Sequence, residues 1–431
     1  MKRAILFAMI GFLILGWCMT GKDLVEKPAY FHKLISEAEK YESEKIYVRA
    51  IKSYKEALTY QPNSVEIKTK IAVDYLALGD ESSFINRCNS INEEHGYPVS
   101  VATLLTDYFI EKGRNEKAIA VLQPAMKKHK NNEELLQRYE KIKYTYADMY
   151  LSYDQILPFR NDSAVYIHNG KYGLIDAKGK TKVREKNEWM GALSSGRDAA
   201  PACLDGEFFY VDDNGYRIEV PRQDQQVEEL GVLCNDAAPA KINGKYGYVN
   251  VKFEEQSPFE WDDATVIQTG FGAVCKGEKW ALLDKSYHLI TDYIYDDVKT
   301  DAYGYCSISG RAFVKSGNAY RMVNEKGETV GELLFQDAVP FVSEEPTAVQ
   351  IGDKWGFVSL DGQLVIEPQY ENAGAFANGL APVETLSGWG YINQSNELVI
   401  EDEYTEACSF YKGIAPVKKG NRWTVISLNV K

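Results

Sequence analysis

The sequence AVQIGDKWGFVSLDGQ, from Ala348 to Gln363, is one copy of the pattern that sets the architecture of the larger part of this 431-residue chain. Its frame returns as APVETLSGWGYINQSNE from Ala381, and in six further, softer copies. Eight copies at intervals of 34 to 40 residues define a tandem repeat of about 36 residues. The aromatic residue at the centre of each copy is Tyr172, Phe208, Tyr246, Trp280, Tyr320, Trp355, Trp389 and Trp423.

Each copy is expected to form short β-strands. An Ala-Pro-Val-like strand and a turn with Gly, Asn or Asp precede a strand in which aromatic and apolar residues alternate. A further turn leads to a third strand such as Leu364–Ile366, and the unit ends on an aromatic-acid-acid-Ala step such as Trp261–Ala264. A glycine inside a strand lets a neighbouring ring or backbone approach closely. Such strand glycines follow the central aromatic as Gly173, Gly247, Gly356 and Gly390.

A unit of this size cannot bury a core alone, so neighbouring units must stack. Two solutions are open: a β-propeller of seven or eight blades, which we favour, and an open β-superhelix. The last unit stops after its second strand, and Tyr146–Phe159, before the first copy, resembles the missing third strand and closing step. A strand from there would close a ring.

The pattern resembles the WG-repeat family, named for the Trp-Gly pair found here at Trp355–Gly356 and Trp389–Gly390. The pairs Tyr172–Gly173 and Tyr246–Gly247 are softened forms of it. The resemblance covers residues 150–431 and implies a β-repeat domain. It brings no catalytic motif with it. The eight central aromatics are therefore expected to be mainly core residues.

Residues 28–148 resemble degenerate tetratricopeptide (TPR) repeats of about 34 residues. Small residues such as Ala38, Ala50 and Ala57 would let paired helices approach closely, and Pro62 would end a helix. Glu133–Tyr150 is expected to form a capping helix. The resemblance implies either a scaffold that grips peptides or partner proteins, or a helical spacer. The fold class is therefore multidomain, a helical solenoid followed by an all-β repeat domain.

Residues 1–21 are expected to be a signal peptide or membrane anchor. Lys2 and Arg3 precede an uncharged run from Ala4 to Gly21, which places the remainder of the chain outside the cytoplasm. Cys18 is a candidate lipid-attachment residue, although Trp17 stands where a lipoprotein signal has a small residue. A lipoprotein, a retained anchor and a cleaved, secreted form all remain open.

The net charge of −13 lies in the β-repeat part. Residues 151–431 hold 27 basic and 42 acidic residues, whereas residues 21–150 hold 20 of each. This charge excludes nucleic acid as a partner, because such binding needs clustered Lys and Arg. Acidic steps such as Asp262–Asp263 and Asp296–Asp297 would form solvated turns, or a rim that attracts basic partners.

The sequence contains no set of residues typical of an enzyme or a cofactor site. The five histidines have no zinc-ligand spacing, no two cysteines form a Cys-x-x-Cys motif, and Asp212–Gly215 has the form of a hairpin turn. We therefore predict a non-enzymatic, membrane-tethered, extracytoplasmic protein-interaction scaffold without metal or cofactor. The alternatives are a cell-envelope glycan-binding module, and a hydrolase or lyase with its site in a propeller channel.

Overall fold

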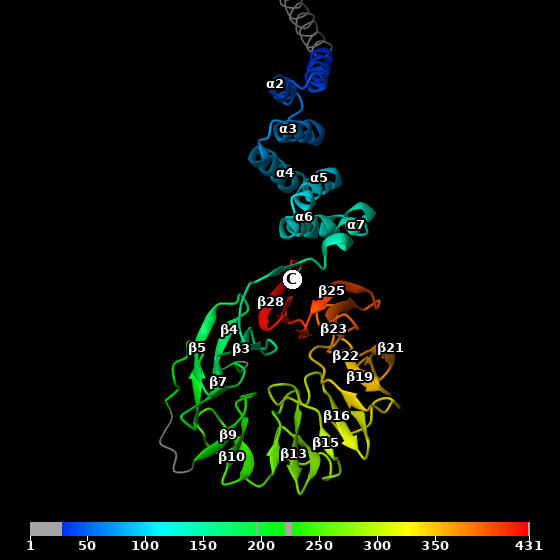
Figure 1. Cartoon of the computed structure of the whole chain (residues 1–431). Helices are drawn as coiled ribbons and strands as arrows, with labels where there is room; N and C mark the ends of the chain where they lie inside the picture. The colour runs from blue at the N-terminus through cyan, green and yellow to red at the C-terminus, as the bar shows by residue number, and fades with distance from the viewer. Residues whose placement is uncertain (1–27, 195, 197, 220–225, 430–431) are drawn as a thin grey trace, which may run out of the picture. The chain divides into compact units, whose positions relative to one another are not determined.

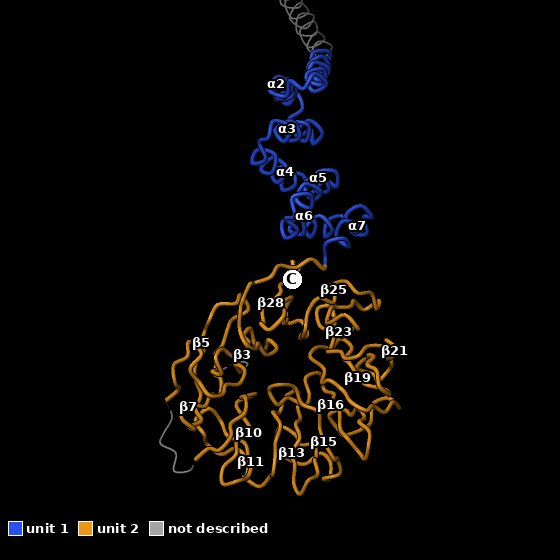
Figure 2. The backbone as a smooth tube through the Cα atoms, viewed as in Figure 1, with its two compact units in different colours: residues 1–143 blue, residues 144–431 orange. Residues whose placement is uncertain are grey.

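The computed structural model describes residues 28–194, 196, 198–219 and 226–429. The chain divides into two compact units, Met1–Lys143 and Tyr144–Lys431 (Figure 2). The predicted signal or anchor, residues 1–21 with Cys18, lies outside the described residues. No helix in the described part of the chain is long and apolar enough to cross a membrane.

The described part of the first unit consists of seven helices (Figure 1). Helix starts are fixed by side chains of Ser64, Asp80 and Asn132, each of which accepts a hydrogen bond from a backbone N–H in the first turn. Alanines at the helix contacts, among them Ala38, are fully buried, as the repeat pattern predicts. The helices span residues 28–43, α2 (Tyr47–Ala57), α3 (Val65–Ala77), α4 (Glu81–His95), α5 (Val99–Glu111), α6 (Asn115–Lys128) and α7 (Glu133–Ile142).

The predicted capping helix is shorter than expected. Helix α7 ends at Ile142, and Tyr146–Asp148, which the prediction included in the helix, forms strand β1 instead. The unit boundary therefore falls between Lys143 and Tyr144 rather than between residues 148 and 150. The reason is long-range, because β1 pairs with a strand almost 300 residues later in the chain.

The described part of the second unit forms eight small antiparallel sheets, one for each expected repeat. We number them in chain order. Sheet 1 holds β2 (Gln155–Ile156), β3 (Ser163–His168), β4 (Lys171–Asp176) and β5 (Thr181–Asn187); sheet 2 holds β6 (Trp189–Met190), β7 (Ala199–Leu204) and β8 (Glu207–Asp212); sheet 3 holds β9 (Val227–Leu230), β10 (Ala238–Ile242) and β11 (Lys245–Val249); sheet 4 holds β12 (Asp263–Ala264), β13 (Phe271–Lys276) and β14 (Lys279–Asp284).

The remaining sheets follow the same order of strands. Sheet 5 holds β15 (Asp297–Val298), β16 (Arg311–Ser316) and β17 (Ala319–Asn324); sheet 6 holds β18 (Asp337–Ala338), β19 (Thr347–Ile351), β20 (Lys354–Val358) and β21 (Leu364–Tyr370); sheet 7 holds β22 (Asn372–Ala373), β23 (Leu380–Glu384), β24 (Trp389–Asn393) and β25 (Leu398–Tyr404); sheet 8 holds β26 (Glu406–Ala407), β27 (Ile414–Lys419), β28 (Arg422–Leu428) and β1 (Tyr146–Asp148).

The boundaries of the sequence repeat differ from the boundaries of the sheets in two ways. The step that was expected to close a unit is itself the short first strand of the next sheet, as in β12, β15 and β22. Among the described residues, the third strand of the sequence repeat is a regular fourth strand of the sheet in sheets 1, 6 and 7, and β1 supplies this strand in sheet 8. In sheets 4 and 5 it is reduced to isolated bridges such as Trp280↔Tyr295 and Tyr320↔Phe335.

The two ends of the second unit meet in sheet 8. Strand β1 pairs with β28 in the register Tyr146↔Leu428, Ala147↔Ser427 and Asp148↔Ile426. Sheets 1 and 8 also share one apolar cluster, in which Ile156 and Tyr166 pack with Trp423 and Val425. Sheet 8, with β28, accordingly lies beside sheet 1, with β3 and β4 (Figure 1). The prediction that Tyr146–Phe159 supplies the missing strand is confirmed.

Candidate functional site

The eight central aromatics occupy one equivalent place at the start of a sheet's third strand. Each belongs to, or packs against, an apolar cluster, as Trp280 and Tyr320 illustrate. Tyr320 and Trp423 are buried, with 4% and 5% of their surface exposed. The other six are half-buried, which leaves part of each ring accessible: Tyr172, Phe208, Tyr246, Trp280, Trp355 and Trp389.

The glycines after these aromatics lie where the next strand comes unusually close. A Cβ on Gly356 would stand 2.5 Å from the carbonyl oxygen of Ile366, and one on Gly390 would stand 2.6 Å from that of Ile400. The register of the pair shifts at both places, so the fourth strand bulges against the glycine. Gly173 and Gly247 face similarly close neighbours, 2.5 Å and 3.0 Å away.

In the repeated pairs of acidic residues, such as Asp262–Asp263 and Asp296–Asp297, the first acid stabilises the fold. Asp262 accepts a hydrogen bond from the N–H of Gly277, 2.7 Å away in the following hairpin turn, and is ion-paired with Lys245. Asp296 repeats both contacts with Gly317 and Lys279. The lysine and this N–H together lower the pKa of Asp262 below its usual range, whereas burial raises the pKa of its neighbour Asp263.

An equivalent ion pair occurs where the two ends of the second unit meet. The partners Lys245–Asp262 and Lys279–Asp296 are each 17 residues apart, as are Lys354 and Glu371. In sheet 8 the cation is Arg422, and its partner is Asp154, from the beginning of the unit. Asp154 also accepts from the N–H of Asn169 at 2.6 Å, so it acts as the first acid of sheet 1.

Sheet 5 carries an insertion that the other sheets lack. From Val298 to Arg311 the chain runs 13 residues, whereas the equivalent stretch of sheet 7, from Ala373 to Leu380, runs seven. We call residues 300–307 of this insertion the strap. Asp301 starts it with a tight turn, in which its carboxylate accepts from the N–H groups of Tyr303 and Tyr305 at 2.9 and 3.0 Å.

The strap reaches sheets 1 and 4. The hydroxyl of Tyr303 donates to the carbonyl of Pro158 at 2.7 Å, and the N–H of Val266 donates to the carbonyl of Gly304 at 2.8 Å. Arg160 forms an ion pair with Asp301, and its guanidinium lies 3.9 Å from the centre of the Tyr305 ring. Tyr303 and Tyr305 are buried in the apolar cluster of sheets 1 and 2, so the strap is a fixed part of the interior.

Two cavities adjoin the strap, and Ala302 and Tyr303 line both. The smaller, of about 330 Å³, lies toward sheets 1 to 3 and includes Tyr172 and Trp189 in its wall. The larger, of about 600 Å³, is lined by residues of sheets 5 to 8, of the start of sheet 1, and by Gln268 of sheet 4. Its size is that of sites for small organic ligands. This larger cavity is the candidate functional site.

The wall of the larger cavity is aromatic, and its charges are balanced. Trp355, Trp389 and Tyr411 contribute rings. The four charged residues of the wall form two ion pairs, Arg160–Asp301 and Lys299–Asp337, the second at 2.7 Å. Such a wall suits a neutral ligand that has both apolar faces and polar groups.

The other groups singled out in the sequence do not form a site. Among the described residues no three His, Cys, Asp or Glu gather as metal ligands. The six described cysteines are free, and burial raises the pKa of the Cys88 thiol to about 12 and that of Cys306 to about 11, which makes them unreactive. Asp212 accepts from the N–H groups of Asn214 and Tyr216, so Asp212–Gly215 is a hairpin turn.

Sequence reasoning missed the strap and the cavity. One signal was present, because the interval from Trp280 to Tyr320 is 40 residues, six more than the 34 from Trp355 to Trp389. The interval indicates an insertion but not where it goes. The contact of Asp301 with Arg160 joins residues 141 apart, and no local pattern predicts it.

These features define the class: a repeat protein in which helical repeats precede β-repeats. The family model described as "WG containing repeat" matches residues 246–280, 320–355, 355–385 and 389–423. The chain therefore carries WG-containing repeats within residues 246–423 and TPR-like helical repeats in its N-terminal part.

A curated relative matches one part of the chain. Tetratricopeptide repeat protein 21B of Xenopus laevis is 26% identical over 113 residues, which are 26% of this chain and 8% of that protein. The chain thus spans less than a tenth of this relative's length.

Two solved structures are each similar to part of the chain. The first TPR of Spaghetti (RPAP3), bound to the HSP90 peptide SRMEEVD, has 18% identity and a TM-score of 0.22, and covers 26% of this chain and 88% of that one. Kluyvelomyces marxianus Hsv2 has 9% identity and a TM-score of 0.36, and covers 61% of this chain and 93% of that one.

Proposed function

We propose that this chain is a non-enzymatic protein-interaction scaffold, tethered on the outer side of a membrane by residues 1–21. Its helical repeats hold a partner protein, and its β-repeat unit is the body to which they are attached. The observation that best supports a role in protein interaction is a cluster of acidic residues around one lysine on the helical repeats. The partner that this charge favours is a segment rich in Lys and Arg.

The acidic cluster consists of Glu39, Glu42, Glu66 and Asp74 around Lys70. Lys70 of α3 lies 3.0 Å from the carboxylate of Glu39 and 3.9 Å from that of Glu42, both on the helix of residues 28–43. Partial burial works to lower the pKa of Lys70, but its hydrogen bond to Glu39 and the nearby charges of Glu42 and Glu66 raise it above its usual value. Glu39, Glu42 and Glu66 against one cation leave a net negative cluster, to which the buried Asp74 adds little charge because burial raises its pKa to about 7.

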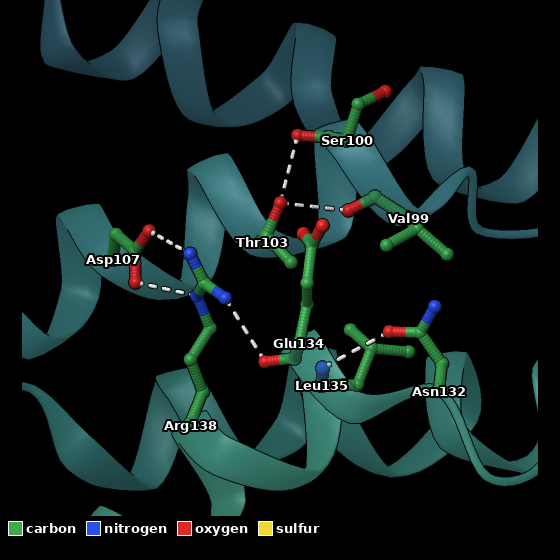
Figure 3. A network of polar contacts seen from close by, with 8 residues as sticks. All are labelled: Val99, Ser100, Thr103, Asp107, Asn132, Glu134, Leu135 and Arg138. Atoms are coloured by element: carbon green, nitrogen blue, oxygen red, sulfur yellow. Dashed lines mark hydrogen bonds and ion pairs between the residues drawn. The ribbon is translucent and has the colours of Figure 1, made fainter.

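Polar groups join first helices of neighbouring pairs at both ends of the unit, and Lys70 with Glu39 is the first such contact. At the other end of the unit, the guanidinium of Arg138 on α7 donates two hydrogen bonds of 2.7 Å to Asp107 on α5 and one of 2.9 Å to the carbonyl of Glu134 (Figure 3). A paired fork of this kind holds the helices in a fixed relation. These two links, one at each end of the unit, support a preformed docking face.

The β-repeat unit is an eight-bladed propeller in this proposal. Three observations support it: the pairing of β1 with β28, the apolar cluster shared by sheets 1 and 8, and the pair Arg422–Asp154 in the place of the repeated Lys–acid pair. The two carboxylates of the larger cavity, Asp301 and Asp337, are each ion-paired with a cation. This favours a binding role over a hydrolase or lyase, whose general acid needs a carboxyl kept protonated.

The interaction is tested by fluorescence anisotropy with labelled short peptides, one set rich in Lys and Arg and a matched set rich in Glu and Asp. The basic set is expected to bind, more weakly as salt rises. Glu39→Gln with Glu66→Gln should weaken binding about fivefold, since exposed charge pairs contribute about 0.5 kcal/mol each. Glu93→Gln, an exposed site on α4, is the control and should bind as the original does.

Equal binding of both peptide sets, or binding unchanged in the double variant, would overturn the proposal. Tethering is tested separately by fractionating native membranes without detergent. Recovery of the whole protein in the soluble fraction would replace the anchor by simple secretion.

A further inference from the structure

We propose that the larger cavity of the β-repeat unit binds a neutral saccharide, with Trp355 and Trp389 as the stacking residues. This site is independent of the peptide-binding function of the helical repeats, because every residue of its wall belongs to the second unit. The chemistry of the wall selects the class of ligand in three steps.

Charge excludes ions as the preferred ligand. The two cations of the wall, Arg160 and Lys299, are neutralised by Asp301 and Asp337 within hydrogen-bonding distance. Arg160 also donates to the side chain of Gln268 at 3.2 Å and lies over the Tyr305 ring. An incoming anion or cation would have to displace a partner that is already held, whereas a neutral molecule leaves both pairs intact.

The aromatic residues supply flat apolar faces together with hydrogen-bond donors. Trp355 and Trp389 stand at equivalent places in sheets 6 and 7, one repeat apart, and both are half-buried in the wall. Neither indole N–H has a hydrogen-bond partner among the described residues, in contrast to Trp261, whose N–H donates to Tyr293 at 2.9 Å. A sugar ring offers C–H faces to an indole ring and hydroxyl oxygens to an N–H donor.

The strap limits the size of the ligand. Ala302 and Tyr303 form one wall of the cavity and separate it from the smaller one, so the site is not an open channel at this place. A volume of about 600 Å³ accommodates a short saccharide and excludes a folded partner. The ion pair of Asp301 with Arg160 and the buried ring of Tyr303 keep this wall in place.

The test is saturation-transfer NMR on the full chain, with glucose, galactose, mannose, N-acetylglucosamine and their disaccharides as probes. Transfer to the ring protons of at least one neutral sugar is expected. Trp389→Ala should weaken its binding about tenfold, the loss of about 1.4 kcal/mol of stacking. Trp355→Phe, which keeps an apolar ring and removes the N–H, should cause a smaller loss.

Trp280→Ala is the matched control, because Trp280 is the half-buried central aromatic of sheet 4 and is not part of the cavity wall. This variant should bind sugar as the original does, and comparable thermal unfolding of the three variants shows that they fold. The proposal is overturned if no neutral sugar binds, or if Trp280→Ala loses as much binding as Trp389→Ala. It is also overturned if benzoate, choline or free indole binds in the cavity more tightly than every sugar.

Discussion

Replacing Asp74 by Asn is expected to stabilise the helical unit at neutral and alkaline pH. Asp74 lies on α3 with 1% of its surface exposed, and its Oδ2 atom has no hydrogen-bond partner. Burial, together with the carboxylate of Glu42, raises the pKa of Asp74 from 3.8 to about 7, and the charge of Lys70 opposes this only in part. The folded protein thus holds a proton that the unfolded chain has already lost.

The sign and the magnitude follow from this difference in pKa. Well below pH 3.8 the group is protonated in both states and causes no loss of stability. Between pH 4 and 7 ionisation of Asp74 stabilises the unfolded chain but not the folded one. The free energy of unfolding therefore falls as the pH rises. A difference of about 3 pH units, at about 1.4 kcal/mol each, gives about 4 kcal/mol at pH 8. Asn has the same shape and cannot ionise, so this loss should disappear.

The assay is urea unfolding of the full chain, followed by circular dichroism at a wavelength dominated by the α-helices, at several pH values from 4 to 8. Asp74→Asn should unfold like the original at pH 4 and at clearly higher urea at pH 8. Glu93→Gln on α4 is exposed and serves as the control, with no change in slope. If Asp74→Asn kept the original pH dependence, the assignment of this slope to the buried carboxyl would be wrong.

Gly356→Ala should destabilise sheet 6 by about 3 kcal/mol, because its Cβ would stand 2.5 Å from the backbone; thermal unfolding of the β-repeat unit measures it. Gly420→Ala, which has a positive φ of 60° and open space around it, should lose only about 1 kcal/mol in the same assay. Asp301→Asn keeps the turn acceptor but leaves Arg160 without its anion, a loss of about 2 kcal/mol, so amide hydrogens of the strap should exchange about thirtyfold faster. Unchanged exchange would mean that the pair does not hold the strap. Ala147→Pro removes one N–H from the edge strand β1 and should speed exchange of the β28 amides that bond to it by about fivefold, whereas Ala147→Val should not.

The repeat pattern predicted the number of sheets because each copy carries its own strand and turn signals. The glycine after the central aromatic accompanies a regular fourth strand in three sheets but does not ensure one, because sheet 3 has Gly247 there and its described residues form only three strands. Sheets 1, 6 and 7 have Gly173, Gly356 and Gly390 there and contain four strands. Sheets 4 and 5 have Ala281 and Arg321 there, and their last segments form only bridges.

Contacts between distant segments were not predictable in the same way. The strand Tyr146–Asp148 follows the helical repeats directly, and its sequence alone was compatible with the end of a helix or with a strand. Only its pairing with β28 decides between the two. The position of Tyr303 beside Pro158 likewise depends on the arrangement of whole sheets and has no counterpart in the spacing of residues.

Closure of the β-repeat unit through β1 and β28 can be measured by engineering a disulfide between Ala147→Cys and Ser427→Cys. These residues are Cα partners, and paired residues of antiparallel strands lie about 5 Å apart, within the range of a disulfide. Mild oxidation followed by peptide mapping should recover the two segments joined within one chain, and the control pair Ala147→Cys with Ser286→Cys, which lies in a turn of sheet 4, should stay unlinked. If residues 147 and 427 stay unlinked as well, the unit is an open superhelix and the account is contradicted.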